Sequence, residues 1–411
     1  MSKMMGAIPA DFAGPELRIG GRTPADLVAE AGDTPLFVYD VAICDARIAR
    51  LRAALPDGVD IHYAMKANPY RPLLEHMVSK VDGIDIASEG ELAMALAAGA
   101  DPAEISFAGP GKRADAMEKA VAAGVTLNCE SEGEAERALA IGARLGKRPR
   151  LAVRVNPDFE IKGSGMRMGG GAKPFGVDAQ RVPALVRTIL DGGADWRGFH
   201  IFAGSQALDA AALIEAQVAT VALAGELADA AGAPPPLINL GGGFGIPHFG
   251  GEQPLDVEAI GAELAKTLSN RAQILADTRF AIELGRWLVG ECGVYLTRIV
   301  DRKISHGKTF LIVDGGLHHQ LAASGNFGQL VRRNYPVAIA DRFGDAPEEE
   351  VSIVGCLCTP LDRLADDVML PRAEVGDLVA IFLAGAYGLS ASPQAFLAQR
   401  PAREMIVGNG G

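Results

Sequence analysis

The sequence predicts an α/β protein with a closed (β/α)8 barrel of the TIM type and a second, all-β domain of the sandwich or small-barrel type. Three observations lead to this fold class. Eight short β-branched or apolar runs alternate with alanine-rich helical stretches up to about residue 286. Nearly every one of these runs ends in a polar residue or glycine. After residue 286 the chain is strand-like, with turn residues between the runs and few helical stretches.

The predicted barrel strands and helices follow one another along the chain. The strands fall at 60–68, 83–90, 105–111, 125–131, 150–157, 198–205, 237–243 and 279–286. Between them, apolar residues recur at three- and four-residue spacing, as at 71–81, 89–99, 113–124, 132–146 and 214–232, and all but the first of these segments end at glycine. This alternation predicts a parallel sheet, and eight such units predict a closed barrel.

The polar residues at the strand ends favour a barrel over a doubly wound open sheet, because in a barrel all these ends meet at one face. They are Lys66, Ser88, Glu130, Asn156, Ser205, the Gly241–Gly243 run and Glu283. We therefore expect the functional site at that face.

The domain boundaries are expected at 41–279 for the barrel and at 1–40 plus 280–411 for the all-β domain. Strand-like runs of the second domain lie at 293–304, 309–316, 349–358, 377–385 and 403–409. The segment TPLFVYD at 34–40 is expected to add a strand to this domain or to bridge the two domains.

Composition excludes several classes of function. The formal charge of −12 argues against nucleic acid or anionic lipid as a partner. No apolar run reaches membrane-spanning length, and the N-terminus lacks a signal-peptide pattern, so we expect no membrane segment. The five scattered cysteines fit reduced cytoplasmic thiols, and Cys356 and Cys358 have too few neighbouring ligands for a zinc site, so no metal is expected.

Lys66 stands near the end of the first run, DIHYAMKAN. Taking an ammonium group out of water is costly unless it is paired or neutralised. One interpretation is an exposed lysine at a strand end. The other is an amine that burial keeps neutral and that forms a Schiff base.

Two further strand ends favour the second interpretation. The glycines of NLGGGFGIP (239–247) follow the seventh predicted strand, where their N–H groups can approach a phosphate closely. Glu283 ends the eighth strand and is a candidate anion beside a protonated pyridine nitrogen, which makes the ring a strong electron sink. Arg286 is placed to serve a phosphate or a carboxylate. Together these features point to pyridoxal 5'-phosphate.

At this point the sequence resembles the fold-type III pyridoxal-phosphate decarboxylases, the family of diaminopimelate and ornithine decarboxylases. The resemblance runs from about residue 35 to 395. The stretches HYAMKANP, DIASEGEL, RVNP, NLGGGFG, ELGR, GCLCTPLD and GDLVAIFLAGAYG carry it, in the family's order.

The resemblance implies a role for each matching residue. Lys66 would carry the cofactor, Glu283 would pair with the pyridinium, and Cys358 would reach the substrate from the partner subunit of a homodimer. The other implied cofactor-binding residues are Asp85, Glu91, Arg154, Ser205, Gly241, Gly242, Gly243, Gly285, Arg286 and Tyr387.

Departures from the family pattern bear on the substrate. Phe202 stands where the family has a histidine stacked on the cofactor ring, and we expect Phe202 to stack there while His200 sits deeper. Thr359 replaces the acidic residue that meets a distal amine, with Asp362 three residues on. The Arg-Pro pair expected after DGG is missing, although Arg332 and Arg333 follow later.

These departures argue against free diaminopimelate, lysine or ornithine, because a pocket built for a charged distal group keeps partners for it. The segments around 162–178, 198–206 and 317–329 are similar to decarboxylases associated with exosortase gene clusters and to the glutamyl-acyl-carrier-protein decarboxylase of butirosin biosynthesis. The implied substrate is an amino acid tethered to a carrier arm, with Thr359, Asp362 and Arg286 near it. The glycine-rich stretch 163–171 is expected to be a loop near the entrance, and Arg332, Arg333 and Lys173 to form a basic patch for the carrier.

The alternatives are a free amino-acid decarboxylase, an amino-acid racemase and a non-catalytic pyridoxal-phosphate protein. The racemase of this architecture has an arginine at the ring nitrogen, so Glu283 favours decarboxylation. The non-catalytic proteins lack a β domain, whereas this chain keeps more than 100 residues after the barrel.

Overall fold

A computed structural model describes residues 4–159, 166–167, 170–327, 329 and 332–408. The predicted entrance loop at 163–171 falls largely outside these residues. The chain forms two compact units. One contains residues 47–246 and 255–285, and the other contains residues 1–46, 247–254 and 286–411. The boundary predicted at residue 279 lies at the first residue of the last barrel strand, and in the structure this unit runs on to Gly285.

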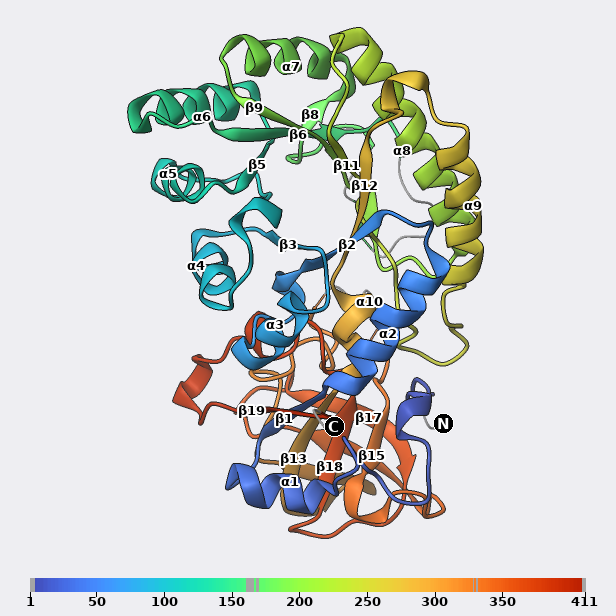
Figure 1. The fold of residues 1–411 in the computed structure, drawn as a ribbon. Helices are drawn as coiled ribbons and strands as arrows, with labels where there is room; N and C mark the ends of the chain where they lie inside the picture. The colour runs from blue at the N-terminus through green and yellow to red at the C-terminus, as the bar shows by residue number, and fades with distance from the viewer. Residues whose placement is uncertain (1–3, 160–165, 168–169, 328, 330–331, 409–411) are drawn as a thin grey trace. The chain divides into compact units, whose positions relative to one another are not determined.

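The first unit is a closed parallel barrel (Figure 1). Its strands are β2 (Val59–Ala64), β3 (Gly83–Ile86), β4 (Ile105–Phe107), β5 (Thr126–Cys129), β6 (Arg150–Asn156), β9 (Asp195–Ile201), β11 (Leu237–Asn239) and β12 (Arg279–Leu284). Neighbours pair in that order, and β12 pairs back with β2, where Glu283 lies opposite His62. All eight predicted strands are therefore confirmed, and the closure excludes an open sheet.

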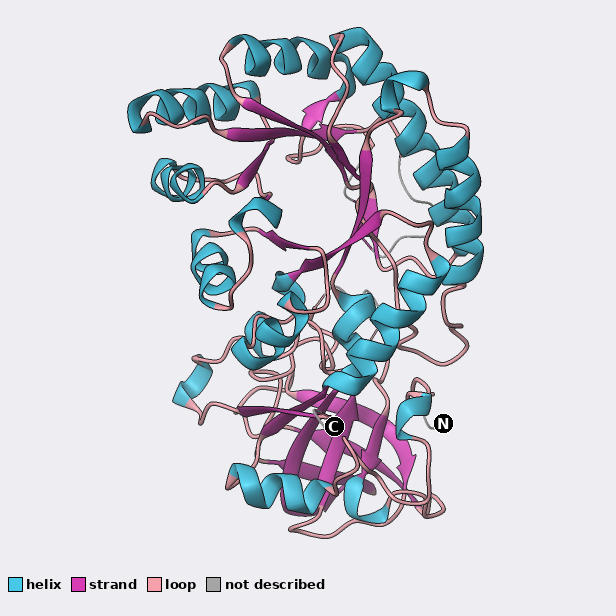
Figure 2. Ribbon diagram, viewed as in Figure 1, coloured by secondary structure: helices cyan, strands magenta, loops and turns pink. Residues whose placement is uncertain are grey.

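Helices surround the strands of this unit (Figure 2). They are α3 (Arg71–Val78), α4 (Glu89–Ala97), α5 (Ala114–Ala123), α6 (Glu132–Leu145), α7 (Val182–Asp191), α8 (Ala210–Ala231) and α9 (Val257–Ser269), and α2 (Val41–Ala54) leads in from the other unit. Ser88 and Ser131 cap α4 and α6, and their hydroxyls accept the N–H of the third helical residue. Short strands β7 (Met166–Arg167), β8 (Val177–Asp178) and β10 (Gly204–Ser205) lie in the connections.

The second unit is a mixed sheet (Figure 2). Its strands are β1 (Leu36–Asp40), β13 (Gly293–Ser305), β14 (Lys308–Val313), β15 (Val337–Ile339), β16 (Glu349–Val354), β17 (Arg363–Leu370), β18 (Leu378–Phe382) and β19 (Arg403–Val407), with α1 (Pro24–Ala31) and α10 (Arg286–Val289). The predicted strand at 34–40 is confirmed as β1, which pairs with β13 and β19. The sequence prediction missed β17, whose two adjacent aspartates interrupt the apolar pattern.

Helix α8 is, among the described residues, long and apolar enough by composition to cross a membrane. Half of its apolar window is nevertheless buried within the protein. The helix contacts α7 and α9 in the outer ring of the barrel. Its apolar character thus fits a helix that is half-buried against neighbouring helices.

A buried histidine pair lies in the mixed-sheet unit, where His318 and His319 have ring centroids 3.8 Å apart. His319 Nε2 donates to the carbonyl of Arg400 at 2.8 Å, and Nδ1 accepts from the hydroxyl of Tyr295 at 3.1 Å. This arrangement uses both nitrogens of a neutral ring. Burial, together with the neighbouring His318, lowers the pKa of His319 to about 4.

The pair predicts a pH-dependent stability. In the unfolded chain a histidine titrates near pH 6.5. Between pH 6.5 and about pH 4 the unfolded chain therefore binds more protons than the folded protein. The free energy of unfolding falls as the pH falls through this range, by at most about 3 kcal/mol. Urea unfolding of wild type and His319→Gln at pH 7.5 and pH 5 checks this. The variant should lose less stability between the two pH values, and equal losses would contradict the prediction.

Candidate active site

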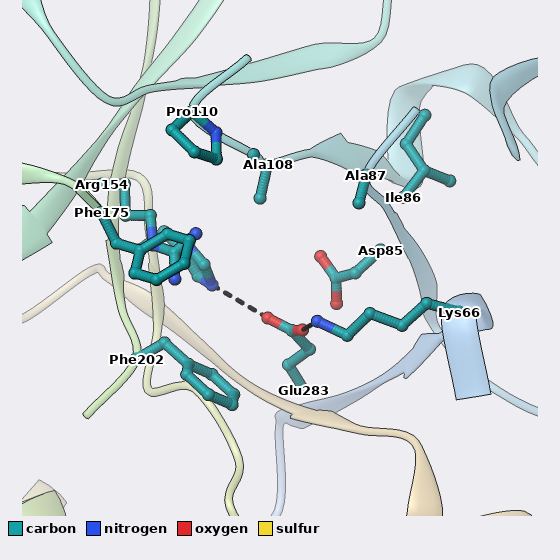
Figure 3. A pocket seen from close by; sticks show the side chains of 12 residues that line it. Lys66, Asp85, Ile86, Ala87, Ala108, Pro110, Arg154, Phe175, Phe202 and Glu283 are labelled. Carbon is teal, nitrogen blue, oxygen red and sulfur yellow. Dashed lines mark hydrogen bonds and ion pairs between the residues drawn. The ribbon is translucent and has the colours of Figure 1, made fainter. Parts of the chain in front are cut away.

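A cavity of about 260 Å³ opens at the carboxyl ends of the barrel strands (Figure 3). Side chains and backbone from six strands or the loops after them converge there, as the polar strand ends predict. Its lining consists of Lys66, Asp85, Ile86, Ala87, Ala108, Gly109, Pro110, Arg154, Phe175, His200, Phe202 and Glu283.

Lys66 lies in the short 3-10 turn Met65–Ala67, directly after β2, and its side chain extends into the cavity (Figure 3). The side chain is 47% exposed. Nζ lies 3.8 Å from Oε1 of Glu283 and 5.8 Å from the ring centroid of Phe202. The side chain is therefore more exposed than the Schiff-base interpretation of the sequence supposes.

Glu283 is buried at the end of β12, and its carboxylate lies between His200 and Lys66. Oε2 accepts a hydrogen bond from Nε2 of His200 at 2.9 Å. Burial alone would raise the pKa of Glu283, but the bond with His200 and the charges of Lys66 and Arg154 outweigh it and hold the pKa well below its usual range. Glu283 is therefore ionised near neutral pH in the cavity wall.

His200 lies deeper than Phe202, as predicted. Its ring is buried, and Nδ1 has no hydrogen-bond partner among the described residues. The ring of Phe202 is half-buried and faces the lysine amine. The pair thus separates two tasks, since His200 orients Glu283 and Phe202 supplies an apolar surface.

Asp85 and Arg154 also line the cavity. Oδ2 of Asp85 lies 3.4 Å from Nδ1 of the buried His62, and this carboxylate raises the pKa of His62 against the opposing effect of burial. Arg154 donates from Nη1 to Glu130 at 3.0 Å, and its guanidinium lies over the ring of Phe175. Both residues are thus held by partners behind the wall.

Glu91 is not part of the cavity lining. Its carboxylate accepts the N–H of Ala87 at 2.6 Å, and its own N–H donates to Ser88 Oγ. Glu91 thereby fixes the turn from β3 into α4, and burial raises its pKa. Glu91 would therefore act on a cofactor indirectly, by fixing this turn or by the interaction of its carboxylate with the charge of Lys66.

The glycine run after β11 approaches the neighbouring strands closely. A Cβ at Gly242 would lie 1.8 Å from the carbonyl oxygen of Glu283, and Gly241 has φ +69°, which favours glycine. The N–H of Ala207 donates to the carbonyl of Gly243, so the loop that carries Ser205 lies beside the run. Gly285 likewise packs against Ala67.

Arg286 and Tyr387 belong to the mixed-sheet unit. The guanidinium carbon of Arg286 lies 4.7 Å from the ring centroid of Tyr387, and Nη1 donates to Nε2 of His248 at 3.3 Å. Tyr335 also hydrogen-bonds Arg286. The two predicted phosphate ligands are thus neighbours, and their role toward the cofactor stays a prediction.

The loop after β16 holds the predicted substrate residues Cys358, Thr359 and Asp362. Cys358 is exposed. Asp362 is buried, and its two carboxylate oxygens accept the N–H groups of Leu317 and Leu357 at 2.6 and 2.9 Å. Asp362 therefore shapes this loop, whereas Thr359 is more accessible.

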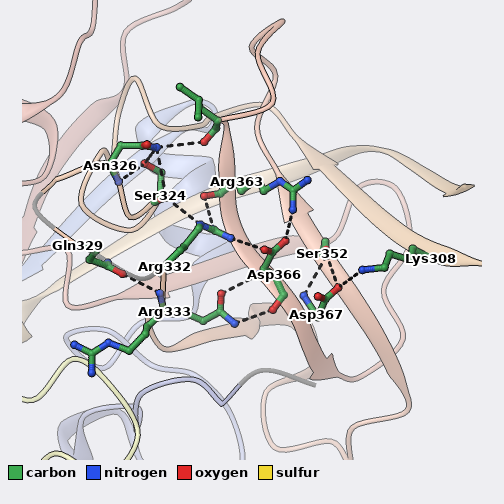
Figure 4. Close-up of polar contacts among 12 residues, drawn as sticks. Lys308, Ser324, Asn326, Gln329, Arg332, Arg333, Ser352, Arg363, Asp366 and Asp367 are labelled. Carbon is green, nitrogen blue, oxygen red and sulfur yellow. Dashed lines mark hydrogen bonds and ion pairs between the residues drawn. The ribbon is translucent and has the colours of Figure 1, made fainter. Parts of the chain in front are cut away.

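The predicted basic patch is largely committed to internal contacts (Figure 4). Arg332 pairs with the buried Asp366 at 3.0 Å and donates to two backbone carbonyls. Arg333 stacks on Phe249 and pairs with Glu252 at 3.2 Å. Lys173 belongs to the barrel unit. Arg332 therefore serves the fold.

Two lining features were not predicted, Phe175 and the 108–110 loop, and neither was the contact of the strand-end residue Glu130 with Arg154. The acidic end of the fourth barrel run was visible in the sequence, but nothing there indicates that Glu130 would bind Arg154 on the neighbouring strand.

Comparison with known proteins supports one family. The family described as pyridoxal-dependent decarboxylase, pyridoxal binding domain, matches residues 42–290. The chain belongs to the pyridoxal-dependent decarboxylases. It is therefore a carboxy-lyase of this family, as the sequence resemblance implies.

Individual relatives cover nearly the whole chain. The L-glutamyl-BtrI acyl-carrier protein decarboxylase of Niallia circulans is 36% identical over 92% of this chain and 90% of that enzyme. The diaminopimelate decarboxylase of Methanothermobacter thermautotrophicus is 32% identical over 95% and 90%. The Helicobacter pylori diaminopimelate decarboxylase, solved with L-lysine, matches with a TM-score of 0.82 and 27% identity over 93% and 94% of the two chains.

Proposed function

We propose that this decarboxylase acts on an L-amino acid whose side chain is joined to a carrier arm, most simply a glutamyl thioester, with pyridoxal 5'-phosphate attached at Lys66. The observation that carries the substrate is the 36% identity, over nearly the full length, to a decarboxylase of a glutamyl acyl-carrier protein. Thr359, which replaces an acidic partner for a distal amine, supports it.

The cavity residues fit a pyridoxal group. A primary amine, a permanent carboxylate and an unpartnered imidazole nitrogen face or border one cavity. The glycine run and Ser205 offer close-packed backbone suited to a phosphate. We propose that Lys66 is the attachment point, with the phosphate held by Ser205, Gly241–Gly243, Arg286 and Tyr387.

The chemistry follows from the charge of Glu283. A bound pyridoxal group supplies an electron sink for the pair left on the α-carbon when CO2 departs. Glu283 would hold a proton on the ring nitrogen of that group, because its carboxylate is ionised and the hydrogen bond from His200 fixes its direction. Phe202 would cover the ring and exclude water, and the amine of Lys66 would hold the group in the cavity.

A racemase is the competing function on this architecture. It would place a cation at the ring nitrogen. In this protein the cavity arginine, Arg154, is bound to Glu130, and the position beside His200 is held by a carboxylate. This arrangement favours decarboxylation.

Free diaminopimelate is the competing substrate, and the similarity to diaminopimelate decarboxylases favours it. Two observations weigh against diaminopimelate as the substrate. Position 359 has no acidic residue, and Arg332 pairs with Asp366. A pocket without charged partners discriminates poorly in favour of a charged distal group.

We also propose a cytoplasmic homodimer with shared active sites. All five cysteines are free thiols, which fits a reducing compartment. Cys358 is exposed, as a residue that reaches a partner's site must be.

A carbon dioxide release assay tests the substrate. The glutamyl thioester of a carrier protein should be turned over, and free diaminopimelate, lysine and ornithine should stay well below about 10⁴ M⁻¹s⁻¹ in kcat/KM. The matched variant Thr359→Asp should gain activity toward free diamino acids. Efficient wild-type turnover of a free diamino acid would contradict the carrier proposal.

Replacing Glu283 tests the electron-sink role. Glu283→Gln should still bind the cofactor but lose kcat by roughly 10²–10³-fold, as for other preorganised charges. His200→Phe removes the bond that lowers the pKa of Glu283, so the acidic limb of the pH–kcat profile should move to higher pH. Near-normal turnover by Glu283→Gln would argue for another group at the ring.

Mixing two inactive variants tests the shared site. Lys66→Ala and Cys358→Ala subunits should together recover up to about a quarter of wild-type activity, because heterodimers restore one intact site. Subunit exchange is verified separately with differently tagged chains. Exchange without recovered activity would exclude a site built from both subunits.

A further inference from the structure

Four buried charged residues lie behind the cavity wall: Lys112, Glu130, Glu134 and Arg154. Their side chains are between 1% and 8% exposed. Two are cations and two are anions, so the group is balanced. Removing one member of such a group leaves an uncompensated buried charge. Only Arg154 lines the cavity.

The carboxylate of Glu130 binds three donors from three segments. Oε1 accepts the N–H of Gly109 at 2.5 Å and Nη1 of Arg154 at 3.0 Å. Oε2 accepts the N–H of Gly176 at 3.1 Å. One buried side chain thus joins the loop after β4, strand β6 and the segment before β8.

These three segments supply much of the cavity wall. The loop after β4 contributes Ala108, Gly109 and Pro110, and the segment before β8 contributes Phe175. The guanidinium carbon of Arg154 lies 5.1 Å from the ring centroid of Phe175. Glu130 therefore fixes wall residues although it does not line the cavity itself.

A second layer holds Glu130 in place. Oε2 of Glu134 accepts the N–H of Glu130 at 2.7 Å and binds Nζ of Lys112 at 3.1 Å. Lys112 also donates to the carbonyl of Gly109 at 2.7 Å, so both backbone groups of Gly109 are bound. Such a connected network is rigid, because every member depends on the others.

The pairing also directs charge. Arg154 and Lys66 are the cations of the lining. Lys66 and His200 contact Glu283, whereas Arg154 pairs with Glu130. We propose that Glu130 is a positioning residue that holds Arg154 and Phe175 in the wall and keeps Arg154 from pairing with Glu283. The inference rests on the proposed role of Glu283 beside the cofactor.

The test uses Glu130→Gln, Arg154→Gln and the double variant. Each apoprotein is titrated with pyridoxal 5'-phosphate, and the visible absorbance of the bound cofactor is followed against pH. Glu130→Gln should weaken cofactor binding roughly 10-fold or more, as replacement of groups that orient metal ligands does. It should also move the absorbance midpoint to lower pH, because an unbalanced Arg154 disfavours the protonated form. The double variant should be no worse than Arg154→Gln alone.

Asp82→Asn is the matched control, since Asp82 binds Arg52 and the N–H of Ile61 but does not line the cavity. It should lower the melting temperature without changing cofactor affinity or the midpoint. If Glu130→Gln does not fold, Glu130→Asp keeps the charge balance and should weaken binding at an unchanged midpoint.

Two results would overturn the inference while wild type binds the cofactor: a Glu130→Gln protein that is less stable but unchanged in affinity and midpoint, or additive effects in the double variant. A wild type that binds no cofactor would instead overturn the proposed function.

Discussion

The burial of a permanently charged carboxylate at the end of β12 is the constraint on which the site depends. An isolated carboxylate in that position would take up a proton or destabilise the barrel. Glu283 stays ionised because His200 donates to it and Lys66 lies 3.8 Å away. The same demand recurs at Arg154, where Glu130 supplies the opposite charge. Glu283 and Arg154 are thus both matched by neighbouring groups, and this matching determines which side chains face the cavity.

Closure of the parallel barrel makes this matching possible. Glu283, His200, Arg154 and Lys66 are distant in the sequence, yet they occupy carboxyl ends of strands that meet at one face. The periodic pattern and the polar strand ends were sufficient to predict these strands and this face. Local patterns cannot predict which side chains pair across the barrel, so the Glu130–Arg154 contact and the position of Phe175 emerged only in three dimensions.

The sequence was less informative about how exposed each side chain is and about which polar residues stabilise the fold rather than bind a ligand. Lys66 was expected to be buried, but a turn after β2 leaves it half-exposed to the cavity. Asp362 and Arg332 were assigned to the substrate or its carrier because of their type and position. Each is instead engaged by backbone groups or a buried partner, and such engagement depends on loop conformation rather than on composition. Strand β17 was missed because its Asp366 breaks the apolar pattern expected of a strand. This aspartate is buried as the partner of Arg332, which the sequence alone does not show.

Family membership and cavity chemistry agree on decarboxylation, while the substrate is determined by the distal part of the site. The relatives are named for different substrates, since one is a decarboxylase of a glutamyl carrier protein and others are diaminopimelate decarboxylases. The uncharged Thr359 fits the proposed substrate, whose side-chain carboxylate is masked as an acyl group.

Chemical mapping of the cofactor attachment is the most direct test of the central claim, that the amine beside Glu283 carries pyridoxal phosphate. The protein is loaded with the cofactor, reduced with borohydride, digested, and its peptides are sequenced by mass spectrometry. The expected result is a pyridoxyl group on Lys66 alone, and its loss in Lys66→Ala. A pyridoxyl group fixed mainly on another lysine, with Lys66 unmodified, would contradict the assignment of this cavity as the active site.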